Sequence, residues 1–77
     1  EALRQVRDVL AAAGIPPDEA ALDAELLARH VLGWDRATLL VQLPDPVPPQ
    51  LPAALAAPVA RRQRREPMAY ILGVQEF

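Results

Sequence analysis

Cysteine, lysine and serine are absent from the 77-residue sequence, and histidine occurs once. Without cysteine the chain has no disulfide bond and no thiolate zinc site. A single histidine cannot build a metal site from imidazole ligands alone, and a serine nucleophile is excluded. The formal net charge of −2 argues against a protein that wraps nucleic acid by charge.

Long apolar runs are also absent. The longest uninterrupted apolar stretch covers residues 53–60, well short of the roughly 20 residues that span a bilayer. No segment resembles a signal peptide, so we expect a cytoplasmic protein without membrane contact. The length fits one small domain, which we expect to be a monomer. The sequence lacks an initial methionine and stops within a pattern at Phe77, so we expect a piece of a longer protein.

Apolar residues recur at intervals of three and four, which is typical of helices packed on one face. The pattern predicts helices over residues 2–13, 18–32, 35–42, 49–65 and 67–72. Glycine follows three of these segments, where a left-handed helix end is easiest for glycine. Asp18 and Asp35 are the expected N-caps. Pro58 lacks an amide donor, so we expect a kink or a broken turn there.

The predicted fold is therefore all-α, a small orthogonal or up-down bundle of about five helices over residues 1–73. Residues 74–77 alternate apolar and polar side chains, which predicts the start of a strand. We expect Trp34 and Tyr70 to be core or partly buried anchors. The side chains expected to face the core are Leu3, Val6, Leu10, Ala13, Ile15, Leu22, Leu26, Leu27, Val31, Leu39, Leu40, Leu43, Leu51, Leu55 and Val59.

One run of positive charge stands out, RRQRR at residues 61–65. Three interpretations are open: a solvated helix end favoured by the helix dipole, a protein-docking patch, or a patch that contacts RNA or phosphate. The run has no interleaved aromatic residue that could stack on bases. His30 lies seven residues after Asp23, or about 10 Å along a helix. We therefore interpret His30 as a structural or half-exposed residue and not as a general base.

Two stretches of sequence carry a family resemblance. DAELL at 23–27 followed by HVLG at 30–33 resembles the early DAELLLxHVLG signature of the release-factor glutamine methyltransferases, the HemK/PrmC family. The RR pair at 61–62, EPMAYILG at 66–73 and EF at 76–77 resemble the family passage RR…GEPxAYILGxxEF. One departure is Arg65, which stands where glycine is common in that passage.

The resemblance implies an N-terminal helical bundle that precedes a β-hairpin linker and a Rossmann-like domain. In the family that domain binds S-adenosylmethionine and methylates the glutamine side-chain amide of the Gly-Gly-Gln motif in class 1 peptide release factors. The implied partner of this chain is such a release factor, which the bundle helps to hold. No catalytic, cofactor-binding or metal-binding residue is implied within these 77 residues. We expect the partner contacts among the exposed members of Arg61, Arg62, Arg64 and Arg65.

Two other functions remain open at this point. The chain could be a free-standing helical interaction module, unrelated to methylation, which a gene ending at Phe77 would favour. It could also be a nucleic-acid binder acting through residues 61–65, which requires a steep salt dependence of binding.

Overall fold

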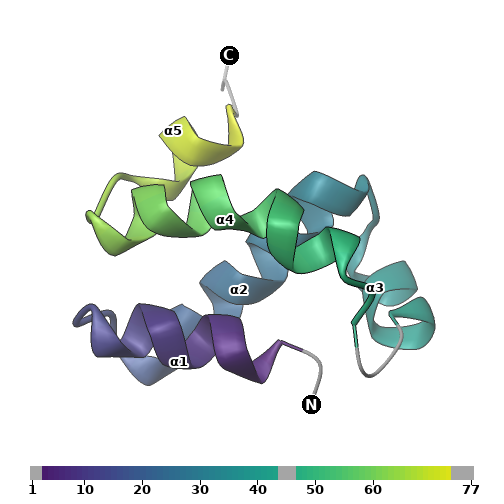
Figure 1. Cartoon of the computed structure of the whole chain (residues 1–77), viewed down its shortest axis with the longest axis horizontal. Coiled ribbons are helices and arrows are strands. Elements are labelled where there is room, and N and C mark those ends of the chain that lie inside the picture. Colours follow the sequence, from purple (N-terminus) through teal and green to yellow (C-terminus); the bar gives the residue numbers. More distant parts are fainter. Residues whose placement is uncertain (1–2, 44–46, 74–77) are drawn as a thin grey trace.

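Five α-helices make up the part of the chain that the computed structural model describes, residues 3–43 and 47–73 (Figure 1). Their bounds are α1 Arg4–Ala12, α2 Pro17–Leu32, α3 Arg36–Gln42, α4 Gln50–Gln63 and α5 Met68–Leu72. These residues contain no strand, so the predicted all-α class is confirmed. The predicted start of a strand at 74–77 lies outside the described residues.

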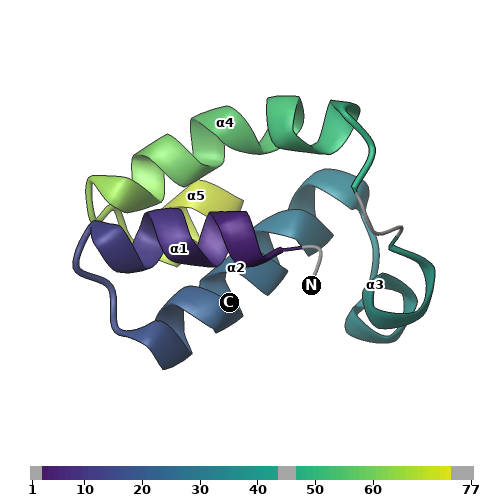
Figure 2. The same ribbon diagram turned by 60° about the horizontal axis from the view of Figure 1, so that its bottom comes forward.

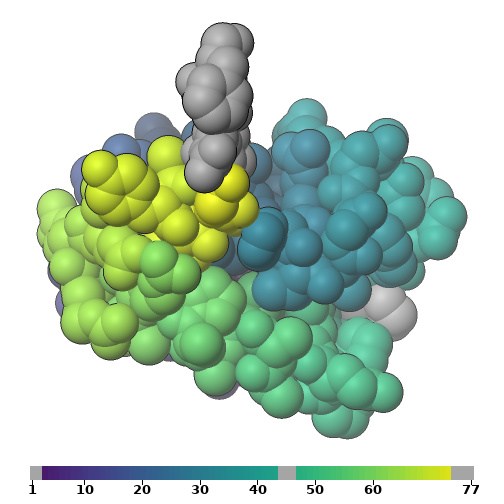
Figure 3. Space-filling view, turned by 90° about the horizontal axis from the view of Figure 1, so that it is seen from above, coloured from purple at the N-terminus to yellow at the C-terminus, as the bar shows by residue number. Residues whose placement is uncertain are grey.

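Helix α2 is the centre of the arrangement, because it contacts each of the other four helices. Helices α1 and α4 also contact one another, and α5 packs against α4. Figures 1 and 2 show α1 and α4 running in the same direction, with α3 at one end of the molecule and α5 near the other. The space-filling view in Figure 3 shows α5 beside both α4 and α2, so the last helices along the chain return to a helix near its beginning.

The ends of the helices follow local chemistry. Asp35 caps α3, since its Oδ1 accepts a hydrogen bond from the Thr38 amide at 2.8 Å, as predicted. The prediction of Asp18 as an N-cap is wrong. Helix α2 begins one residue earlier, at Pro17, because proline presets the helical φ at a first position. Asp18 and Glu19 instead lie in the first turn, where the helix dipole favours negative charge.

Helix α4 continues through Pro58 from Gln50 to Gln63, so the expected broken turn does not occur. Proline removes only one amide donor, and the apolar stripe on both sides of it holds the helix in place: Leu55 is buried and Val59 packs against the same core. The helix ends two residues earlier than predicted. Arg65 adopts a φ of 66°, in the left-handed region, which a regular helix cannot include.

The core consists of three clusters of buried side chains that Val6 joins. Their buried members are Leu3, Leu10, Ile15, Ala20, Ala24, Leu27, Ala28, Leu39, Leu51, Leu55 and Ile71. Alanines at three of these positions lie on α2, and their small side chains let neighbouring helices approach closely. The buried side of α2 is thus lined by alanine and Leu27.

Three predicted core positions are corrected by this geometry. Leu22 is exposed and Leu26 only half-buried, because the alanine-lined side of α2 turns them away from the centre. Leu40 is exposed because α3 packs against α2 alone and buries only Leu39. The leucine pattern therefore predicted an apolar face for α2 that differs by a small rotation about the helix axis from the face that packs in the structure.

Candidate docking surface

The four arginines near the end of α4 have four different surroundings. Arg61 and Arg62 lie in the last turn of α4, and Arg64 and Arg65 follow it. The structure therefore does not present the RRQRR run as one uniform positive patch. The side chains differ in which groups they bind and in how much of each remains exposed.

Arg62 points inward, toward α2. Its Nε donates to Oδ2 of Asp23 at 2.8 Å, and the two side chains are only 14% and 5% exposed. Its Nη1 also donates to the backbone carbonyl of Glu66 at 3.1 Å. A guanidinium has donors in a planar fork, so one side chain can join two acceptors in this way. Arg62 therefore connects α2 to the turn between α4 and α5.

Arg61 points toward α5 and forms an ion pair with the carboxylate of Glu66. Its Nη2 also donates to the backbone carbonyl of Tyr70 at 3.4 Å. The hydrogen bond from Arg61 lowers the pKa of Glu66 below its ordinary value of 4.5, and the same bond raises the pKa of Arg61. The side chain of Arg61 keeps 39% of its surface exposed, so part of it remains accessible to a partner.

Arg65 lies against the turn between α1 and α2. Its Nη1 donates to the carbonyl of Ala13 at 3.4 Å. The same atom lies 3.0 Å from the place that a Cβ at Gly14 would occupy, so a side chain there would press on the guanidinium. The positive φ of Arg65 explains why glycine suits this position in the resembled sequence passage, because glycine adopts that conformation without steric cost.

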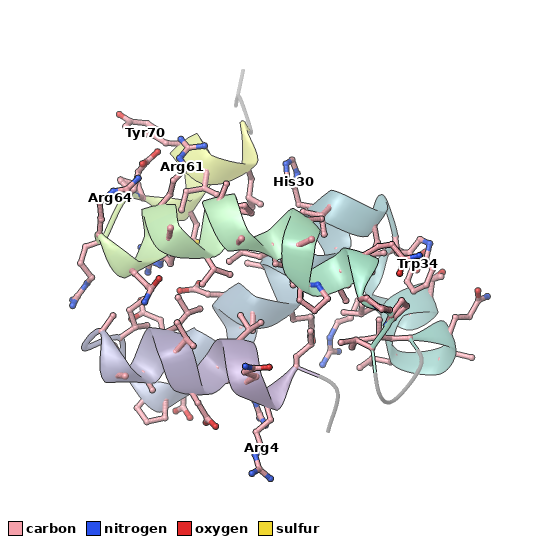
Figure 4. All side chains as sticks on the ribbon, in the orientation of Figure 1. Arg4, His30, Trp34, Arg61, Arg64 and Tyr70 are labelled. Atoms are coloured by element: carbon pink, nitrogen blue, oxygen red, sulfur yellow. The ribbon has the colours of Figure 1, made fainter. Side chains whose placement is uncertain are left out.

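Arg64 is exposed, and Figure 4 shows it at the same end of the molecule as Arg61 and Tyr70. Tyr70 is 72% exposed, so its predicted role as a buried anchor is wrong. Helix α5 has five residues and buries only Ile71, which leaves the neighbouring position outside the core. We call Arg61, Arg64 and Tyr70 the Arg–Tyr patch. The shortness of the helix predicted at residues 67–72 was the signal that could have identified Tyr70 as exposed.

His30 and Asp23, which are seven residues apart on α2, are not brought together. His30 is exposed and projects outward in Figure 4, whereas Asp23 is buried against Arg62. The prediction that His30 is not paired with Asp23 as a base is consistent with this geometry. Trp34 is half-buried and packs against the cluster around Leu39, as expected of an anchor.

An apolar groove of about 190 Å³ runs between α1 and α4. Val6, Val9, Leu51, Leu55 and Val59 are among the residues that line it, and Gln5 is a polar residue at its edge. Arg61, Arg64 and Tyr70 are not among the residues that line it. It is therefore separate from the Arg–Tyr patch, although the same helix contributes to both.

Residues 3–43 and 47–73 contain neither a cluster of metal ligands nor a helix that could span a membrane. No group of three or more histidine, cysteine, aspartate or glutamate residues could hold a metal ion in that part of the chain. No helix there is both long enough and apolar enough to cross a membrane.

The fold and the patch together define a small helical domain in which the accessible side chains of Arg61, Arg64 and Tyr70 gather at one end. The sequence of residues 1–73 matches the family described as the PrmC N-terminal domain. The chain belongs to this family, as the resemblance of its two motif stretches predicts.

Similar full-length proteins are named release factor glutamine methyltransferase. The relative from Cereibacter sphaeroides is 46% identical over 77 residues, which is 100% of this chain and 27% of that protein. The relative from Bordetella pertussis is 49% identical over 72 residues, which is 94% of this chain and 25% of that protein. The chain thus spans about a quarter of the length of these relatives. No solved structure gives a significant match.

Proposed function

We propose that this chain is the domain that binds and positions the substrate in a protein-glutamine N5-methyltransferase. The substrate is a class 1 peptide release factor, methylated on the glutamine of its Gly-Gly-Gln motif in the cytoplasm. The observation that carries the proposal is the match of residues 1–73 to the PrmC N-terminal domain. The coverage of only about a quarter of each methyltransferase relative supports a division of labour, with methyl transfer performed by the remainder.

S-adenosylmethionine is the methyl donor that this proposal requires. The described residues do not fit it, because a nucleotide-type cofactor needs clustered glycines that let backbone amides approach. Gly14, Gly33 and Gly73 are isolated, and each follows a different helix. We therefore place the cofactor, and the methyl transfer itself, in the part of the enzyme beyond this domain.

A separate domain for binding helps this reaction for a physical reason. Methyl transfer needs the amide nitrogen to approach the methyl carbon in line, so correct orientation of a large substrate contributes to the rate. Contacts remote from the reacting atoms supply binding free energy that can be used for this orientation. Two contact regions in one enzyme also raise the effective concentration of the second region once the first is bound.

We propose the Arg–Tyr patch as the contact with the release factor. Arg62 and Arg65 already bind groups of their own chain. Arg64 and part of Arg61 are accessible beside Tyr70, whereas Arg65, which is also exposed, extends toward the turn between α1 and α2. Arginine and tyrosine are enriched among the residues that dominate binding energy at protein interfaces. The positive patch predicts a carboxylate-bearing surface on the release factor.

The patch supports a protein partner over RNA. An RNA contact through residues 61–65 would use the positive charges together, but Arg61 and Arg62 each bind a carboxylate of this chain. Tyr70 is the one exposed aromatic side chain among the described residues of this end of the molecule. Direct binding of RNA to the enzyme, with an affinity that falls steeply as the salt concentration rises, would favour the RNA contact instead.

The test compares the full-length enzyme with a variant that lacks residues 1–73. We expect the truncated enzyme to bind S-adenosylmethionine normally and to lose most of its kcat/KM on intact release factor. A short Gly-Gly-Gln peptide serves as the control substrate, and its methylation should change little. Equal kcat/KM on intact release factor with and without the domain would contradict the proposed function.

A further inference from the structure

The two motif stretches meet in space through one buried ion pair. Asp23 belongs to the first stretch and Arg62 to the second, and 39 positions separate them in the sequence. Asp23 is the buried charged residue of the described chain. Burying a charge costs free energy unless the charge is paired, so the folded state requires Asp23 and Arg62 to be in contact.

Arg62 and its neighbour Arg61 also bind the segment that follows α4. Arg62 donates to the carbonyl of Glu66 at 3.1 Å, and Arg61 binds the Glu66 carboxylate and the carbonyl of Tyr70. The turn after α4 and the first turn of α5 are thus held by two neighbouring guanidinium groups. One of these groups, Arg62, is fixed to the central helix through Asp23.

Apolar packing alone holds α5 weakly. The helix has five residues, far fewer than an isolated helix needs to be stable, and Ile71 is its one buried side chain. Met68 and Leu72 pack partly buried against the same cluster, so the apolar contacts of this short helix lie on the side that faces the core. The polar contacts to the Glu66 carbonyl and carboxylate and to the Tyr70 carbonyl add attachments from α4, two of them just before the helix begins.

We propose that Asp23 and Arg62 are positioning residues that fix the direction of α5 relative to α2. In the full-length enzyme this direction sets how the helical domain is oriented toward the methyltransferase part. The inference rests on the proposed function and deepens it: the domain holds the release factor, and the Asp23–Arg62 pair aims it. Residues at the patch should therefore affect binding, and this pair should affect orientation.

The decisive variant is Arg62→Lys in the full-length enzyme. Lysine keeps the positive charge for Asp23, but its ammonium is a point donor without the planar fork that reaches Glu66 at the same time. Arg36→Lys is the matched control. Arg36 also pairs with a carboxylate of α2, Glu25, at 3.0 Å, but its own side chain is 67% exposed and it contacts no residue of α5 that the structure records.

Two readouts distinguish orientation from simple stability. Spin labels at Glu19→Cys on α2 and Ala69→Cys on α5, both exposed sites, report the distance between the helices by double electron–electron resonance. We expect a narrow distribution in the parent enzyme and in Arg36→Lys, and a broad one in Arg62→Lys. We also expect Arg62→Lys to lower kcat on intact release factor by about tenfold with KM nearly unchanged, since misplaced reactants react slowly.

Several results would overturn the inference. A broad distance distribution in the parent enzyme would do so even if Arg62→Lys failed to fold. So would a narrow distribution and full kcat in a folded Arg62→Lys enzyme, or a change confined to KM. The proposed function fails in a different experiment, the one in which removal of residues 1–73 leaves kcat/KM on intact release factor unchanged.

Discussion

Helix α2 has two unlike sides, and two of its carboxylates show the difference. Asp23 and Glu25 are two residues apart, and each pairs with an arginine from another part of the chain. The Asp23–Arg62 pair is buried and joins segments 39 positions apart, whereas Arg36 pairs with Glu25 at the surface across 11 positions. The comparison teaches that the same pairing chemistry can hold a fold together on one side of a helix and contribute little on the other.

Neutralising Asp23 should give the largest loss of stability. In Asp23→Asn the Arg62 guanidinium stays buried without its counter-charge, which typically costs about 3–5 kcal/mol. Glu25→Gln removes a pair in which Glu25 is 16% exposed but its partner Arg36 is 67% exposed, for which about 0–1 kcal/mol is expected. Urea unfolding of both variants measures the difference. Equal losses would show that burial does not distinguish the two pairs.

The apolar residues of α2 should show the same contrast. Leu27 is fully buried, so Leu27→Ala should lower the unfolding free energy by about 2–5 kcal/mol. Its neighbour Leu26 is half-buried, so Leu26→Ala should cost clearly less. Thermal and urea unfolding provide the comparison. A loss at Leu26 as large as that at Leu27 would place the packed side of α2 elsewhere.

The ion pair of Arg61 with Glu66 should appear in the pH dependence of stability. Because folding lowers the pKa of Glu66, its contribution is present above the ordinary value of 4.5 and is lost as the pH falls through the lower folded value. The pKa of Asp35 is lowered too, chiefly by the hydrogen bond from the Thr38 backbone, so Asp35 adds to the same loss of stability in acid. Glu66→Gln removes the contribution of Glu66 and should reduce the slope of the unfolding free energy against pH on the acid side, measured by urea unfolding at a series of pH values. An unchanged acid slope would contradict this assignment.

The Arg–Tyr patch should give the smallest effect on stability and a clear effect on binding. Arg64→Glu changes an exposed side chain, so the unfolding free energy should move by less than about 0.5 kcal/mol. The reversed charge should slow association with the release factor and raise KM. Stopped-flow binding at low and moderate salt measures the rate, with Arg4→Glu on α1 as a matched reversal at an exposed site away from the patch. Equal slowing by both variants would indicate general charge and not a docking contact.

Local chemistry explains what could be predicted from the sequence. Apolar spacing and glycine positions predict five helices, and Asp35 with its short polar side chain predicts a cap that the structure contains. The family resemblance, carried by DAELL and EPMAYILG, correctly predicts the family of the chain. Each of these signals lies within a few turns of one segment.

Contacts between distant segments explain what could not be predicted. The partner of Arg62 is 39 positions away, so a run of four arginines gave no indication that one of them is buried. The alanines of α2 determine which side of the helix is packed, and this turned Leu22 outward. Tyr70 is exposed because α5 turns Met68, Ile71 and Leu72 toward the core and Tyr70 away from it. In each case the local sequence is compatible with either a buried or an exposed side chain, and packing against distant segments determines which one occurs.

The order of the paired residues along the chain has a consequence for synthesis on the ribosome. A nascent polypeptide that ends before residue 62 contains the carboxylate of Asp23 but not its guanidinium partner. The buried ion pair between α2 and α4 can form only after Arg62 has left the ribosome, so this contact is completed late in the synthesis of the domain.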